Sequence, residues 1–196
     1  MSWKQAKVMA PGEQRRLLSV AGRGRLPERD RVMVLLAVRA GLRAREVAYL
    51  TWGMVLDPSG NVAAVIEVRD GIAKRGAGRR VPMHPQLRQA LIALRRLLPA
   101  EQANSDAVIV RSLRGDALRP NSVVNWFIAR CREAGLQGCS SHSGRRTFIT
   151  KAARAAHRAG ASLRDVQLLA GHRSIETTQA YIDSDSDAQR RLVSLI

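Results

Sequence analysis

The sequence has no long apolar run, few cysteines and few aromatic residues, and each shortage excludes a class of protein. No stretch approaches the ~20 apolar residues of a membrane span, and Met1 to Ala10 lack a signal-peptide core, so we expect a soluble cytoplasmic protein. Cys131 and Cys139 have no Cys or His neighbour at zinc-ligand spacing, which indicates free thiols and no metal site. The aromatic content of 4% offers few stacking platforms for single-stranded nucleic acid.

Acidic residues are also scarce beside the basic ones. The 196 residues include 33 lysines and arginines against 16 aspartates and glutamates, a formal net charge of +17. Such a surface attracts polyanions such as nucleic acid, but net charge alone does not separate DNA from RNA, and a basic RNA-binding protein is a weaker alternative. Only four of the basic residues are lysines, so a lysine in a motif is more informative than an arginine.

The spacing of apolar residues predicts a mainly helical α+β fold, with prolines, glycines and capping residues at the helix ends. Length favours one domain, two at most. Helices are expected over 28–40, 45–51, 143–159 and 162–169, and after Pro85 and Pro120. A small antiparallel sheet of three strands, beside the helical bundle, is expected from residues 55–56, 62–68 and 79–83.

The segment 41–46, Gly-Leu-Arg-Ala-Arg-Glu, places Arg43 one helical turn from Glu46. A carboxylate at that spacing can orient the guanidinium. Taken alone, the segment fits a solvated basic helix start better than a functional site.

The segment 71–80 is rich in glycine and arginine, which is typical of a flexible hairpin that approaches a DNA backbone. Lys74 is its only group suited to donate a proton, because arginine keeps its proton near neutral pH and a lysine among other cations can lose it. A hairpin that merely clamps phosphates is an equally good interpretation of this segment.

His142 and Arg145 lie three residues apart at the start of a predicted helix, so both can reach one ligand where the helix dipole favours an anion. Arg145 also begins the apolar stripe that continues through Phe148 and Ile149, and a buried guanidinium needs an anionic partner. A histidine that merely caps the helix is the simpler alternative, but the position of Arg145 favours a phosphate site.

His172 and Tyr181 lie nine residues apart, and in one continuous helix about 900° would place them on opposite faces. A break over 171–174 removes that conflict, since His172 then precedes a helix and Tyr181 lies about two turns inside it. A tyrosine hydroxyl can act as a nucleophile. Tyr49, the other tyrosine of the chain, is expected in the core.

The order and spacing of these motifs, over about 27–182, resemble the catalytic domain of the tyrosine recombinases, the phage integrase family. The resemblance implies that Tyr181 attacks a DNA phosphate, forms a 3′-phosphotyrosyl link and releases a 5′-hydroxyl, without ATP, metal or other cofactor. The implied catalytic set is Arg43, Lys74, His142, Arg145, His172 and Tyr181, with Glu46 in support. DNA-binding side chains are expected at Arg45, Arg75, Arg79, Arg80, Arg146 and Arg173.

Two departures from the family pattern stand out. Gly144 and Arg146 flank the second arginine where the family often has leucine and histidine, and this can alter local packing. The family's N-terminal DNA-clamping domain has no counterpart in the few residues before 27, as in compact recombinases such as fimbrial inverters, or in a fragment. We therefore expect a short basic segment (1–26), a recombinase catalytic domain (27–182) and a tail helix (183–196) that protomers can exchange or dock on their own domain.

The resemblance also implies partners and leaves alternatives. Activity would require a homo-oligomer on DNA, usually a tetramer, and accessory DNA-bending proteins are possible partners. A type IB topoisomerase would share the tyrosine chemistry and relax supercoils without paired sites. A catalytically idle relative would act as a DNA-binding regulator and would not need the tyrosine.

Overall fold

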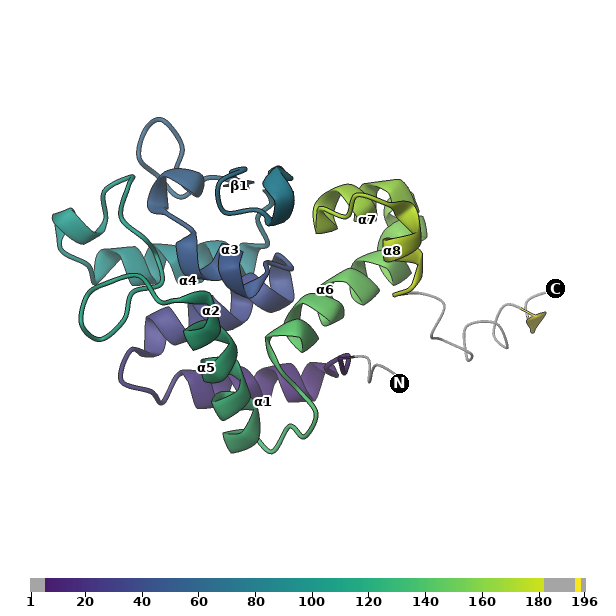
Figure 1. The fold of residues 1–196 in the computed structure, drawn as a ribbon, viewed down its shortest axis with the longest axis horizontal. Helices are drawn as coiled ribbons and strands as arrows, with labels where there is room; N and C mark the ends of the chain where they lie inside the picture. Colours follow the sequence, from purple (N-terminus) through teal and green to yellow (C-terminus); the bar gives the residue numbers. More distant parts are fainter. Residues whose placement is uncertain (1–5, 182–192, 195–196) are drawn as a thin grey trace. The chain divides into compact units, whose positions relative to one another are not determined.

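The computed structural model describes residues 6–181 and 193–194, which belong to two compact units, Met1–Phe148 and Ile149–Ile196 (Figure 1). We refer to them as the larger and the smaller unit. The tail helix expected over 183–196 lies outside the described residues except for 193 and 194. Over the described part of the chain, no helix is long and apolar enough to cross a membrane.

The larger unit is built around α2 (Pro27–Arg39), whose residues from Val32 to Val38 are all buried. A helix that is apolar on every side needs neighbours on every side, and α2 contacts three other helices. Proline opens four helices of this unit at the first helical position, where its missing N–H costs nothing. The three helices in contact with α2 are α1 (Pro11–Ala21), α3 (Ala44–Tyr49) and α4 (Pro85–Arg96), and α5 (Pro120–Glu133) packs against α1 and α3.

The sheet has two strands in the described residues, β1 (Val65–Val68) and β2 (Arg79–Pro82), paired antiparallel. The expectation of a third strand was wrong, because Leu56 and Val62 form only an isolated bridge. A 3₁₀ turn at Trp52–Met54 ends just before this segment, and a tight turn closed by the Gly60 N–H on the Asp57 carbonyl (2.9 Å) begins just after it. Too few residues remain between the two turns to form a strand.

The boundary between the units falls within α6 (Ser141–Ala156), which begins two residues earlier than expected and ends in a 3₁₀ turn at His157–Ala159. The smaller unit also holds α7 (Leu163–Ala170) and α8 (Ile175–Gln179), which contact each other. Gly171 has a φ of +62°, which glycine adopts without strain, and it ends α7. The predicted break after α7 is therefore confirmed.

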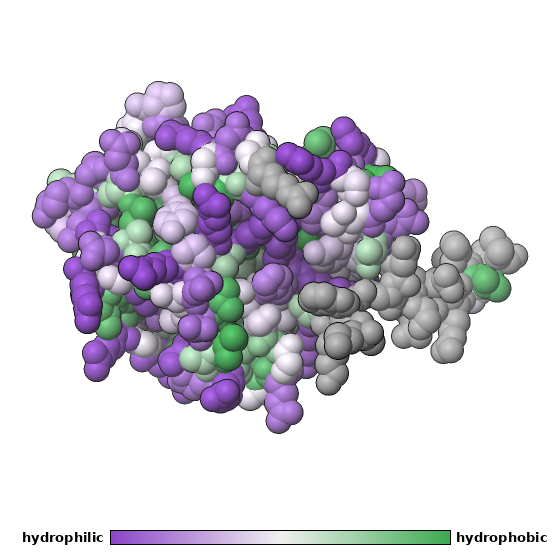
Figure 2. All heavy atoms as spheres, viewed as in Figure 1, coloured by the Kyte–Doolittle hydropathy of each residue, from purple (hydrophilic) through white to green (hydrophobic). Residues whose placement is uncertain are grey.

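The described surface is mainly polar. On the face drawn in Figure 2, hydrophilic side chains predominate and apolar ones form small separate patches. Exposed large apolar side chains such as Leu97, Leu113 and Leu168 are normal when they occur singly. Cys131 and Cys139 are buried and not disulfide-bonded, which confirms the expectation of free thiols.

Candidate active site

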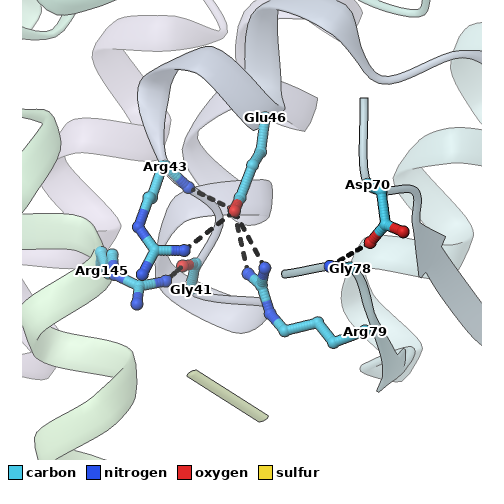
Figure 3. Close-up of polar contacts among 7 residues, drawn as sticks. All are labelled: Gly41, Arg43, Glu46, Asp70, Gly78, Arg79 and Arg145. Carbon is cyan, nitrogen blue, oxygen red and sulfur yellow. Dashed lines mark hydrogen bonds and ion pairs between the residues drawn. The ribbon is translucent and has the colours of Figure 1, made fainter. Parts of the chain in front are cut away.

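The turn between α2 and α3 holds the first catalytic candidate, Arg43, which is the N-cap residue of α3. Its backbone N–H donates to Glu46 Oε2 (2.8 Å), and its Nη1 donates to Glu46 Oε1 (3.0 Å). The Glu46 side chain is fully buried, and these contacts fix the direction of the Arg43 side chain (Figure 3). The contact expected from the spacing of the two residues is therefore present.

Arg145 of α6 reaches the same turn from a position 104 residues after Gly41. Its Nη1 donates to the Gly41 carbonyl oxygen at 2.5 Å, and the residue is 6% exposed (Figure 3). Gly41 has a φ of +64°, and a Cβ there would lie 2.4 Å from Phe148 Cδ1, so a larger residue does not fit. The turn thus gathers the guanidinium groups of Arg43 and Arg145, a pair that can bind a phosphate by several charge-assisted hydrogen bonds.

His142 lies in the first turn of α6 and is exposed. This end of α6 packs closely on α2, because a Cβ added at Gly144 would lie only 2.7 Å from Ala37 Cβ. Gly144, where the family often has leucine, therefore allows this close approach of α6 to α2. His142 and Arg145 stand three residues apart at a helix N-terminus, where backbone N–H groups and the helix dipole favour an anion.

Lys74 lies on the connection between β1 and β2, in a 3₁₀ turn at Lys74–Gly76, and is exposed. Among the described residues it has no hydrogen-bond or ion-pair partner. The base of this connection is closed by the Gly78 N–H, which donates to Asp70 Oδ1 at 2.7 Å (Figure 3). Arg45 of α3 also donates to the Gly71 carbonyl oxygen at 3.2 Å. The loop is tied down on both sides of Lys74, and the lysine itself faces solvent.

Glu46 has a second arginine partner, Arg79, the first residue of β2. Arg79 Nη1 and Nη2 donate to Glu46 Oε1 and Oε2, each at 2.9 Å (Figure 3). Burial alone would raise the pKa of the Glu46 carboxyl, but the hydrogen bonds and charges of Arg79 and Arg43 outweigh it and hold the pKa below its ordinary value. The carboxylate therefore stays ionised in the interior.

The smaller unit holds the two remaining candidates. The rings of His172 and Tyr181 are stacked, with centroids 5.5 Å apart and 26° between their planes. His172 Nδ1 lies 2.9 Å from the hydroxyl oxygen of Thr178, which is fully buried, and the His172 carbonyl accepts from Gln167 Nε2 at 3.0 Å. The expectation that Tyr181 lies two turns inside a helix was wrong, because α8 ends at Gln179. The backbone N–H of Tyr181 instead donates to the Thr178 carbonyl oxygen at 3.1 Å, in the turn that follows α8.

The residues expected to bind DNA differ in exposure. Arg45, Arg80 and Arg173 are exposed and Arg146 is half-buried, so these four stay predictions. Arg79 is different, because its side chain is 6% exposed and two of its donors are engaged by Glu46. The side chain of Arg75 is outside the described part of the structure.

Sequence reasoning missed three contributions to the site. Gly41 supplies a carbonyl to Arg145, Thr178 contacts the His172 ring, and Arg79 pairs with Glu46. A signal for Arg79 was present, since alternate residues of a strand share a face and Val81 of β2 is buried. A backbone carbonyl and a threonine hydroxyl leave no comparable trace in the sequence.

Comparison with known proteins gives a family for this geometry. The model of the phage integrase family matches residues 7–188. The chain belongs to the phage integrase family. The chain is 31% identical over 160 residues to the tyrosine recombinase XerC of Rhodospirillum centenum, and the match covers 81% of this chain and 43% of that protein. It is 32% identical over 180 residues to XerA of Thermococcus kodakarensis, covering 89% and 57% of the two chains.

The fold also matches solved recombinase structures. The crystal structure of XerA recombinase superposes with a TM-score of 0.74 at 22% identity, covering 100% of this chain and 65% of that one. This match confirms the fold, and the family model confirms the family predicted from the motifs. The chain spans about half the length of the curated relatives it matches. Among the described residues, no group of three or more His, Cys, Asp or Glu could hold a metal ion.

Proposed function

We propose that this chain is the catalytic part of a site-specific DNA recombinase that breaks and rejoins strands through a covalent 3′-phosphotyrosine. In the forward step the Tyr181 oxygen attacks the scissile phosphorus and the bond from phosphorus to the 5′ oxygen breaks. The leaving 5′ oxygen takes a proton, and the tyrosine hydroxyl loses one. In the reverse step a 5′-hydroxyl attacks the phosphotyrosine and restores a DNA strand, so the bond energy is kept.

The roles follow from what each side chain can donate or accept. Arg43 and Arg145 stabilise the charge that develops on the phosphorane oxygens, for which preorganised guanidinium forks are suited. His142 takes the tyrosine proton or holds it in a hydrogen bond. Lys74 protonates the leaving oxygen, and His172 donates a further hydrogen bond to the phosphate.

The observation that carries the proposal is the pairing of Tyr181 with His172. A nucleophile for phosphoryl transfer needs a fixed direction of approach. The tyrosine ring is stacked on an imidazole whose Nδ1 lies at 2.9 Å from a buried hydroxyl. Tyr49, the other tyrosine of the chain, is half-buried in α3 and serves as the control for Tyr181.

Double-stranded DNA, a homo-oligomer on that DNA and accessory DNA-bending proteins are the partners that this activity would involve. The positive charge supports the first, because +17 over 196 residues favours binding to phosphates. The test of the charge argument is the salt dependence of DNA affinity, whose log-log slope should be about −0.9 per phosphate neutralised. An affinity that does not change with salt would contradict it.

The experiment that tests the activity is covalent trapping. The protein is incubated with a library of random-sequence duplexes that carry a nick next to the cleavage position, so that the released 5′ end diffuses away and religation fails. We expect covalent adducts with the wild type and with Tyr49→Phe, and none with Tyr181→Phe. If adducts form, and the protein also relaxes a supercoiled plasmid without exchanging strands between two sites, a topoisomerase is favoured. Absence of any adduct, with DNA binding intact, would leave only a DNA-binding regulator.

A further inference from the structure

The buried carboxylate of Glu46 joins two parts of the larger unit that each carry a catalytic candidate. One is α3, whose N-cap residue is Arg43, and the other is the hairpin of β1 and β2, whose connection carries Lys74. Both oxygens of Glu46 accept from Arg79 of β2, and both also accept from Arg43 (Figure 3). A shift of β2 along α3 would therefore break hydrogen bonds on a fully buried charge.

The loop that carries Lys74 is short and tied at its base. Val68 pairs with Arg79 in the ladder, and the Gly78 N–H donates to Asp70 Oδ1 at 2.7 Å. A Cβ at Gly78 would lie 2.7 Å from both Asp70 Oδ1 and the Val68 carbonyl oxygen, so the two sides of the loop are in close contact there. Whatever fixes Arg79 therefore also fixes the base of the Lys74 loop.

The surroundings of Arg79 fit a side chain that holds the protein together better than one that binds DNA. It is 6% exposed, and its planar fork is matched to the carboxylate by two hydrogen bonds of 2.9 Å. Arg80, the next residue, is a contrast, because its side chain is 74% exposed and lies 3.7 Å from the exposed Glu67. Since neighbouring residues of a strand point to opposite faces, the pair forms a built-in comparison.

We propose that Arg79 is a positioning residue, which sets the Lys74 loop against Arg43 through Glu46 and does not itself bind DNA. This role rests on the proposed strand-cleaving function of the chain. Loss of Arg79 would leave the Glu46 carboxylate to Arg43 alone and free the base of the loop. The lysine would then be misplaced as proton donor although every catalytic side chain remains.

The test compares Arg79→Ala with Glu67→Ala, a change at an exposed position of β1, in the full chain. Cleavage is measured under single-turnover conditions at saturating concentration of a duplex recovered by covalent trapping. Because a misplacement of about 1 Å costs about 100-fold in rate, we expect Arg79→Ala to slow cleavage by about that factor. Glu67→Ala should cleave within about twofold of the wild type, because Glu67 is an exposed residue of β1 that belongs to neither the catalytic nor the DNA-binding set.

A second substrate separates positioning from general damage to the fold. It carries sulfur in place of the bridging 5′ oxygen, and a thiolate leaves without protonation because its conjugate acid is far stronger than an alcohol. We expect this substrate to recover most of the rate lost in Arg79→Ala. A defect of equal size on both substrates would overturn the proposed link to Lys74.

DNA binding is measured separately on a random-sequence duplex over a range of salt concentrations. Arg80→Ala should reduce the log-log slope by about 0.9, the value for one phosphate, and Arg79→Ala should leave it unchanged. A reduced slope and normal cleavage at saturation in Arg79→Ala would return Arg79 to the DNA-binding set. If the wild type itself forms no adduct, the proposed function fails, and the salt slopes still decide whether Arg79 contacts DNA.

Arg79→Ala strands a buried charge and can impair folding, so a paired variant is included. Arg79→Met with Glu46→Gln removes both charges of the pair, which is commonly tolerated, and the glutamine oxygen can still accept from Arg43. We expect this folded variant to cleave slowly on the ordinary duplex and to recover with the sulfur substrate. Wild-type cleavage by this double variant would overturn the proposal. Arg79→Lys should also stay slow, because an ammonium cannot form the two-pronged contact.

Discussion

The close contact between α6 and α2 at Gly144 predicts a strong coupling between Gly144 and Ala37. A Cβ added at Gly144 would lie 2.7 Å from Ala37 Cβ, about 1 Å inside the ~3.5–4.0 Å separation of carbon atoms in contact. Overpacking of this kind costs about 1–3 kcal/mol, and a helical Gly→Ala change returns about 1 kcal/mol through helix propensity. We therefore expect Gly144→Ala to destabilise the protein by about 0–2 kcal/mol.

The double-mutant cycle isolates the contact. With Ala37→Gly as the second change, the nearest atoms to the added Cβ would be Ala37 C and Val38 Cγ1, both at 3.5 Å. Propensity terms cancel in the cycle, so the two changes together should be about 1–3 kcal/mol more stable than the sum of the single effects. Urea unfolding followed by circular dichroism measures all four proteins. A coupling below about 0.5 kcal/mol would refute the close packing that positions Arg145.

Three further outcomes are expected. Thr178→Val removes the hydroxyl that contacts the His172 ring, a hydrogen bond that contributes about 1 kcal/mol, so single-turnover cleavage should fall roughly fivefold. Equal cleavage rates for Thr178→Val and for the exposed control Thr177→Val would contradict this. The pKa of the Glu46 carboxyl is lower in the folded than in the unfolded protein. The ionised carboxylate therefore stabilises the fold above its unfolded pKa of about 4.3, and this stabilisation is lost as the pH falls through its folded pKa. The stability gap between wild type and Glu46→Gln, measured by urea unfolding, should therefore narrow in acid and not widen. Burial raises the pKa of Cys131 to about 12, so this thiol should react with a disulfide reagent only on unfolding, and rapid labelling of the native protein would count against its burial.

Much of the site follows from local rules that a sequence expresses directly. Glu46 three residues after Arg43 predicts their contact, and the rotation between His172 and Tyr181 predicts the break at Gly171. Both inferences depend only on helix geometry. They hold because the members of each pair are close in the sequence, at the ends of one helix or of one short helix and the turns beside it.

Contacts between distant segments are harder to predict from the sequence. Arg79 meets Glu46 across 33 residues, and whether a strand arginine faces a buried acid or solvent depends on register and tertiary packing. The prediction of a third strand was wrong for a related reason, since the flanking turns leave too short a segment for the strand that the apolar pattern indicated. The end of α8 before Tyr181 is likewise a boundary, the feature that periodicity determines least.

The most direct test of the central claim is the identity of the peptide that carries trapped DNA. Trypsin cleavage at arginine separates the two tyrosines, since Tyr181 falls in 174–190 and Tyr49 in 46–69. We predict that mass spectrometry finds the nucleotide adduct on the peptide 174–190 alone, at Tyr181. An adduct on 46–69, or on another nucleophile when Tyr181→Phe is used, would contradict the account.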